Sequence, residues 1–133
     1  MRMEEVLDEF HSNWLPNITV RGLSRLAQLL ESGSPLLVHG TFTKACAMGC
    51  LASHIAWNHP ETADRAEDAG VVWLTKIAGL NPATSTVIVA WDRAQPQDWT
   101  LRKELLRLLK QEQFQRENEA KPRWLRVATL PVA

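Results

Sequence analysis

The stretch ACAMGCLASHIAWNHP, residues 45–60, contains no formally charged side chain, although 23% of the chain is charged. Placed on a helix, it shows no polar face, because Met48, Leu51 and Ile55 lie on one apolar side and small residues lie beside them. A helix that is apolar all round is either a membrane span or the buried centre of a globule, and this one is too short to cross a bilayer. We therefore predict a buried central helix over residues 45–58.

Length and composition predict one globular domain over residues 1–133. An apolar content of 45%, with six tryptophans, is enough for a packed core without a disulfide or a structural metal. Fifteen basic and fifteen acidic residues give a formal net charge of zero. This balance weighs against nucleic acid as a partner, because affinity for nucleic acid comes mainly from Lys and Arg at the phosphates.

No stretch of the sequence has the pattern typical of a targeting signal. The N-terminal segment MRMEEVLDEF is acidic and amphipathic, and no apolar run is long enough for a membrane span. Two cysteines four residues apart do not make a disulfide framework. We therefore expect a soluble, cytoplasmic protein with reduced thiols and no contact with a membrane.

The rest of the chain predicts short helices separated by proline and glycine. Apolar residues at helical spacing predict a helix that begins near Asn17 or Thr19, both suitable caps, and ends at Gly33, with Arg21 and Arg25 on its polar side. His59-Pro60 and Asn81-Pro82 are expected to open further helices, and Asp98 to cap the longest one, which runs to about Ala120.

The fold class that follows is all-α, a compact array of about six short helices around the central one. The second possibility is a small α/β domain with strands at residues 36–39, 86–91 and 124–130, because short β-branched runs suit either structure. For residues 86–91 we favour a helix, since Ile88 and Trp91 lie three residues apart.

Cys46, Cys50 and His54 are the strongest candidates for chemistry. Spaced four apart on a helix, they would form one row of thiolate and imidazole ligands suited to a transition metal, with His39 or His59 as a fourth ligand. The spacing is not that of a common zinc module, and both thiols are equally well explained as buried core residues. We therefore expect no cofactor, with a thiolate-ligated metal as the alternative.

The tryptophans are candidates for lining a pocket. Trp57, Trp73 and Trp91 fall on three successive predicted helices, although each is also explained as a core residue that needs one partner for its indole N–H. No nucleotide-binding, hydrolase or metalloprotease motif occurs, so we single out no catalytic residue and do not favour an enzyme.

The function that the sequence favours is a protein-interaction module or homodimer. Residues 123–133 form an apolar tail that could dock on the domain or on a neighbouring subunit, with Trp124, Leu125 and Leu130 as contact residues. The alternative is a protein that binds a small molecule or a transition metal through Cys46, Cys50 and His54.

Overall fold

The computed structural model describes residues 2–44, 48–94 and 98–125, and over these ranges it confirms the all-α class. The α-helices in the described residues are α1 (Met3–Glu9), α2 (Val20–Ser32), α3 (Leu51–Trp57), α4 (Ala69–Val72), α5 (Thr86–Arg93) and α6 (Thr100–Ala120). Two short strands, β1 (Thr43–Lys44) and β2 (Met48–Gly49), pair in antiparallel fashion before α3. No helix in the described part of the chain combines the length and the apolar character needed to cross a bilayer.

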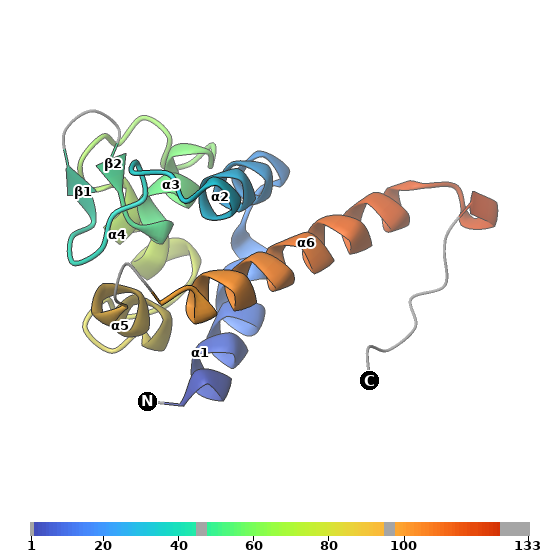
Figure 1. The fold of residues 1–133 in the computed structure, drawn as a ribbon. Coiled ribbons are helices and arrows are strands. Elements are labelled where there is room, and N and C mark those ends of the chain that lie inside the picture. Colours follow the sequence, from blue (N-terminus) through green and yellow to red (C-terminus); the bar gives the residue numbers. More distant parts are fainter. Residues whose placement is uncertain (1, 45–47, 95–97, 126–133) are drawn as a thin grey trace.

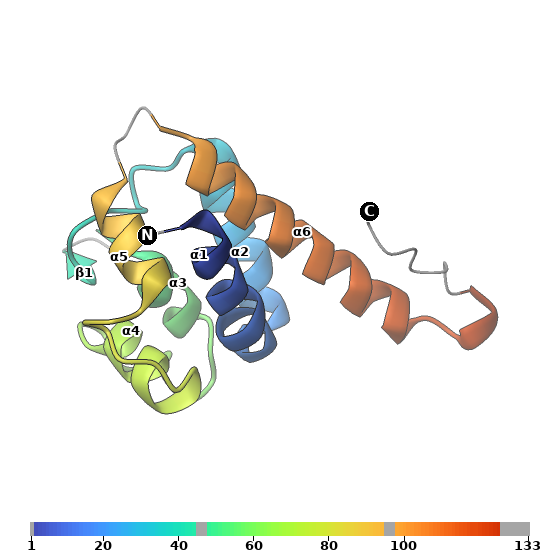
Figure 2. The same cartoon turned by 90° about the horizontal axis from the view of Figure 1, so that it is seen from below.

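Helix α3 is the buried centre of the packed helices, which are here called the body. Its residues from Leu51 to Ala56 are all buried, and it packs against α2 on one side and α4 on the other. Helix α1 contacts α5, and α6 runs along α2 and α1 (Figure 1). Seen from below, α6 continues well beyond the helices that it crosses (Figure 2).

The predicted central helix begins only at Leu51, so the prediction is wrong for residues 48–50, and residues 45–47 lie outside the described residues. Cys50 is the N-cap residue of α3, and Gly49 lies in β2. The backbone there forms bonds to distant segments, from Gly49 N–H to Leu36 O and from Cys50 N–H to Phe42 O, both 2.9 Å long. A buried strand and a buried helix both lack a polar face, so the uncharged run could not distinguish them.

Glycine allows two close approaches to α3. An ideal Cβ on Gly70 of α4 would lie 2.9 Å from the Ser53 backbone N, and one on Gly49 would lie 2.7 Å from the Ser53 Cβ. Any side chain at these positions would therefore push α4 or β2 away from α3.

Several predicted helix ends are confirmed. The Thr19 side chain accepts a hydrogen bond from Gly22 N–H at the start of α2, and Gly33 ends this helix in the left-handed conformation, with φ of 62°. Helix α6 ends at Ala120, as expected, but its N-cap residue is Trp99 rather than the predicted Asp98, whose carboxylate accepts from Thr100 N–H one residue later. Residues 86–91 are helical and Trp124 and Leu125 lie in a 3₁₀ turn, so neither place is a strand of the α/β alternative; residues 126–130 lie outside the described residues.

Other predicted boundaries are wrong. The helix expected at Pro60 is replaced by a series of turns, and α4 begins only at Ala69. Helix α5 begins after Ser85 rather than at Asn81-Pro82, because Ser85 Oγ accepts from Ile88 N–H. Residues 36–39 form neither a helix nor a strand; the segment turns, and Leu37 makes a single parallel bridge to Gly49.

Two helices pass into π-turns that carry buried tryptophans. The turn Phe10–Trp14 follows α1 and the turn Trp73–Ile77 follows α4. Trp14 and Trp73 are both fully buried, and their rings lie 5.3 Å apart between centroids at an angle of 59°. This contact joins the N-terminal segment to the α4 segment.

Glu9, at the end of α1, holds the start of α5. Its Oε2 accepts hydrogen bonds from Ser85 Oγ at 2.6 Å, Trp14 Nε1 at 3.0 Å and Val87 N–H at 3.1 Å. Its Oε1 accepts from Thr86 N–H at 2.9 Å. Two N–H groups of the first turn of α5, which have no partner within that helix, are thus satisfied by a carboxylate from another helix.

Glu9→Ala should lower the free energy of unfolding by about 2–3 kcal/mol, because it leaves several partly buried donors without an acceptor. Glu9→Gln should recover only part of this loss. All four partners of Glu9 are hydrogen-bond donors, and glutamine keeps one accepting oxygen but replaces the other with an NH₂ group, which cannot accept a hydrogen bond. Urea denaturation measures both variants. Glu4→Ala, on the exposed side of α1, is the control and should change little; equal stability of Glu9→Ala and wild type would contradict the role of Glu9.

Candidate functional site

Cys50 is a buried thiol where β2 turns into α3. Its side chain is 2% exposed, and burial, the largest effect, raises the pKa of the thiol. Its Sγ lies 3.9 Å from Ser53 Oγ, and backbone N–H groups of Ala52 and Ser53 act on the thiol as well. A thiol that is buried and kept protonated is a poor nucleophile and a poor metal ligand at neutral pH.

Ser53 connects the segments around Cys50. Its Oγ donates to Phe42 O and lies 3.2 Å from Thr43 Oγ1, which itself donates to Glu67 O at 2.9 Å. These bonds join the segment before β1 to α3 and to the turn before α4. No described bond links this hydroxyl or the Cys50 thiol to a histidine, so the arrangement lacks the base that a serine or cysteine nucleophile needs.

His54 serves the fold in the same way. Its Nε2 lies 2.8 Å from Leu36 O, so this nitrogen must carry the proton and donate it to the carbonyl. Burial lowers the pKa of His54, and the positive charge of Arg25 lowers it further. His54 therefore stays neutral and ties α3 to the segment at residues 36–38.

The five ligand candidates are not brought together by the described residues. His39 Nδ1 lies 2.6 Å from Trp91 O, whereas His59 Nδ1 accepts from Glu61 N–H at 3.1 Å in the turn after α3. Cys46 lies outside the described residues. Over the parts of the chain that the structure describes, no three His, Cys, Asp or Glu side chains form a group that could hold a metal ion.

Each of the three tryptophan candidates has a partner for its indole N–H. Trp73 Nε1 donates to Asn17 O at 3.3 Å, and Trp91 Nε1 donates to Val38 O at 2.7 Å, both from fully buried rings. Trp57, at the end of α3, is half-buried and donates to Ala66 O at 2.9 Å. All three join separate segments of the body, as core tryptophans do.

A cluster of aromatic and basic side chains holds the first turns of α6. The His39 ring stacks on Trp91 with centroids 4.0 Å apart, and the Arg102 guanidinium carbon lies 5.1 Å from the Trp91 ring and 5.2 Å from the Trp99 ring. Arg102 Nη2 lies 3.4 Å from His39 Nε2. Because Nδ1 of His39 donates to Trp91 O, Nε2 can act as the acceptor of this weak bond.

Arg102 is unusual because its charge is partly buried. Its Nη1 has no hydrogen-bond partner among the described residues, and burial lowers the pKa of the guanidinium. Stacking on two indole rings compensates in part for the lost hydration. No pattern in the sequence indicates this role, since Arg102 sits among other charged residues of a long helix.

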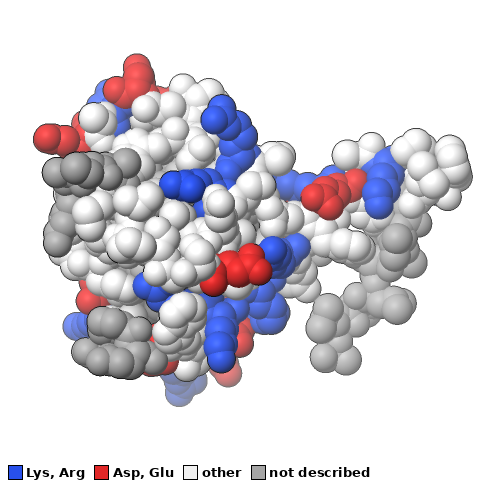
Figure 3. All heavy atoms as spheres, turned by 45° about the horizontal axis from the view of Figure 1, so that its top comes forward, with Lys and Arg blue, Asp and Glu red and all other residues white. Residues whose placement is uncertain are grey.

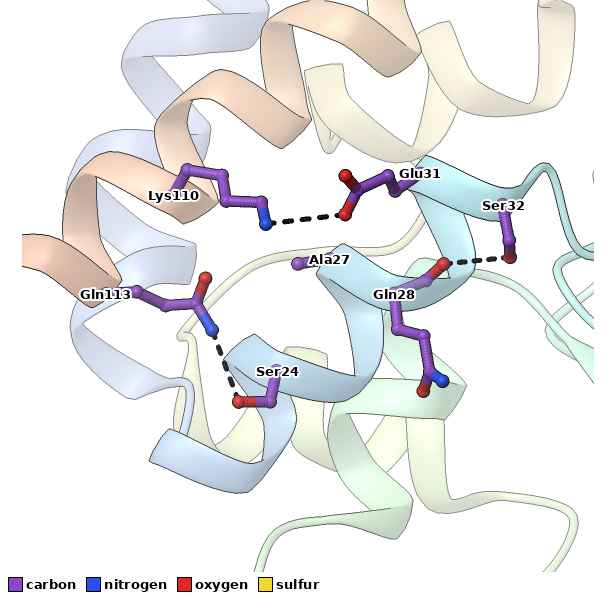
Figure 4. Close-up of a pocket in the computed structure, with 7 residues that line it drawn as sticks. All are labelled: Ser24, Ala27, Gln28, Glu31, Ser32, Lys110 and Gln113. Carbon is purple, nitrogen blue, oxygen red and sulfur yellow. Dashed lines mark hydrogen bonds and ion pairs between the residues drawn. The ribbon is translucent and has the colours of Figure 1, made fainter.

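Two hollows lie on the outer surface of α2. The first, of about 370 Å³, lies between α2 and α6, where Lys110 points to Glu31 and Gln113 to Ser24 across the Ala27 side chain (Figure 4). These pairs are 3.3 Å and 3.2 Å apart, so the polar groups of this hollow bind one another. The second, of about 500 Å³, includes Arg21 and Arg25, which were predicted on the polar side of this helix.

The C-terminal arm is defined here as residues 110–125, the second half of α6 and the 3₁₀ turn Arg123–Leu125. Arg116 fixes its base, because the guanidinium donates to Leu15 O at 2.7 Å, to Ile18 O at 2.6 Å and to Glu112 Oε2 at 2.7 Å. Beyond this point α6 projects from the body, as Figures 1 and 2 both show, although the Asn118 side chain is buried. Leu130 lies outside the described residues.

The chain shows no similarity that would suggest a function: no family model, no curated protein and no solved structure matches it.

The stability of the fold should depend on His54 at acid pH. The native pKa lies below the ordinary value of 6.5, so the unfolded chain takes up this proton first as the pH falls. The free energy of unfolding should therefore decrease as the pH drops through that value, and His54→Gln should flatten this decrease between about pH 7 and pH 5. Chemical denaturation across this range tests it, with exposed His11→Gln as the control; an unchanged slope in His54→Gln would refute the assignment.

Cys50 should be unreactive in the native protein because it is buried and protonated. In a Cys46→Ala background, we expect a colorimetric thiol reagent to modify Cys50 only at the rate of local or global unfolding, and quickly in urea. Rapid modification of the native variant at neutral pH would show that the thiol is accessible.

Proposed function

We propose that this protein is a protein-interaction module that forms a homodimer through its C-terminal arm. The single observation that carries the proposal is Trp124, which is 81% exposed at the far end of the arm. Leu125 and Phe114 on the same arm are 48% and 47% exposed. Large apolar side chains gathered on one projecting element are typical of a surface that is covered by a partner.

The energetics favour a covered arm. Burying one tryptophan side chain removes about 150–250 Å² from water, worth about 4–6 kcal/mol before the costs of association. Tryptophan is also among the residue types most enriched at the centres of interfaces. The body does not need these side chains, since its core is closed by fully buried residues such as Trp14, Trp73 and Trp91.

A second copy of the chain is the partner that the charges favour. The charges of fifteen basic and fifteen acidic residues cancel, so two copies of the chain are not repelled by a net charge. The arm itself carries both signs, including Lys110, Glu112 and Arg123. Two such arms related by a twofold axis would present the same self-complementary surface to each other.

The arm is also positioned for binding before a partner arrives. The two bonds of Arg116 to Leu15 O and Ile18 O fix the direction in which α6 leaves the body, and a continuous helix spans from the body into the arm. A rigid element loses little conformational freedom when it binds. The alternative, binding of a small molecule or a transition metal, has no comparable support among the described residues.

Trp124→Ala combined with Leu125→Ala should weaken self-association by at least about tenfold, because it removes the most exposed apolar surface of the arm. Sedimentation velocity over a range of concentrations measures this for the chain of residues 1–133. Val20→Ala, which trims a 66% exposed side chain on the body, is the matched control and should associate as wild type does.

Two results would contradict the proposal. One is a wild-type protein that stays monomeric at every concentration. The other is a dimer whose affinity is the same in wild type and in the double variant. Circular dichroism of each variant establishes that the fold is retained, which we expect because both side chains lie outside the core.

A further inference from the structure

We propose that the second hollow on α2, here called the α2 groove, binds an acidic segment of a partner protein. The groove has a volume of about 500 Å³ and is lined by Val20, Arg21, Ser24, Arg25, Gln28 and Asn58. It lies on the body, where Ser24 also bonds to Gln113 at the start of the arm.

Two arginines without acidic partners give the groove its character. Arg21 and Arg25 lie one turn apart on α2, on the same side of the helix, where like charges disfavour the helix. The ion pairs of the described residues all lie elsewhere, and neither arginine takes part in one. Arg25 donates to the neutral amide oxygen of Gln28 at 3.1 Å. Figure 3 shows basic atoms over α2 that are surrounded by uncharged atoms.

The positive charge of Arg25 also acts on a neighbouring helix. Next to the larger effect of burial, it lowers the pKa of His54, which is buried in α3. In a protein whose charges cancel overall, the groove is thus a local region of positive potential.

The groove is held in shape by bonds to α3. Thr19 Oγ1 donates to Asn58 O at 2.8 Å, and Asn58 Nδ2 donates to His54 O at 2.9 Å. One wall of the groove is therefore fixed to the start of α2. At its edge Val20 is 66% exposed, which offers an apolar contact beside the two charges.

These features describe the ligand. It carries two carboxylates at the spacing of one helical turn, about 6 Å, to pair with Arg21 and Arg25. An apolar side chain next to these carboxylates contacts Val20, and polar backbone groups of the ligand form hydrogen bonds with Ser24 and Gln28. Such a pattern is that of an acidic, amphipathic peptide segment. A nucleic acid fits less well, because its binding depends on many phosphate contacts and the protein has no net positive charge.

Fluorescence anisotropy with a labelled peptide tests the proposal. The probe is a short peptide with two Glu residues four positions apart and a Leu beside them, and the same peptide with Gln in place of Glu is the control ligand. The intact 133-residue chain should bind the Glu peptide at low salt and lose affinity as salt rises. Arg21→Gln with Arg25→Gln should weaken binding by at least about tenfold, because two charge-assisted contacts are lost.

Two control variants separate binding in the α2 groove from general charge attraction and from self-association. Arg93→Gln removes an exposed arginine from α5 and should bind the peptide as wild type does. Trp124→Ala with Leu125→Ala should also bind it normally, so failure of the dimer and failure of the groove can be told apart. The proposal is overturned if the Gln peptide binds equally well, if the double arginine variant keeps full affinity, if the Glu peptide does not bind, or if a single-stranded oligonucleotide displaces it.

Discussion

The Glu9 carboxylate is the interaction on which much of the body depends. It ends α1, bonds the indole of Trp14 in the π-turn that follows, and satisfies the first N–H groups of α5, 77 and 78 residues away in sequence. Trp14 in turn contacts Trp73 after α4. One charged side chain thus connects the N-terminal segment to two distant parts of the chain, and it does so by accepting bonds from donors that would otherwise be left without partners.

Much of the fold was predictable because local signals and burial agreed. Thr19 and Gly33 bracket α2 in the sequence as they do in the structure, and α6 ends at Ala120 as the sequence predicts. The start of α3 was not predictable, because residues 48–50 form backbone bonds to residues 36 and 42, and no local pattern encodes such partners. Pro60 led to a wrong prediction for a different reason, because a proline that is suited to the first turn of a helix is equally suited to an ordinary turn.

The candidate sites were predictable only in part. Trp124 and Leu125 are exposed, and their role as contact residues stays a prediction, whereas the burial of His54 and Cys50 agrees with the simpler interpretation of both as core residues. The α2 groove was visible in sequence only as like charges one turn apart at Arg21 and Arg25. Whether such charges meet a carboxylate from elsewhere in the chain is a property of the tertiary structure. The same holds for Arg102 between its two indoles.

The two π-turns have a consequence for insertions and deletions. A π-turn holds one more residue than an α-turn, so every side chain after it is rotated by roughly 100° about the helix axis. Phe10–Trp14 and Trp73–Ile77 both contain such an extra residue, and the rings of Trp14 and Trp73 meet. The number of residues in these two segments is therefore constrained as strongly as their identity. Replacing one apolar residue by another changes only the local packing. Adding or removing a residue changes which face of the helix meets the core.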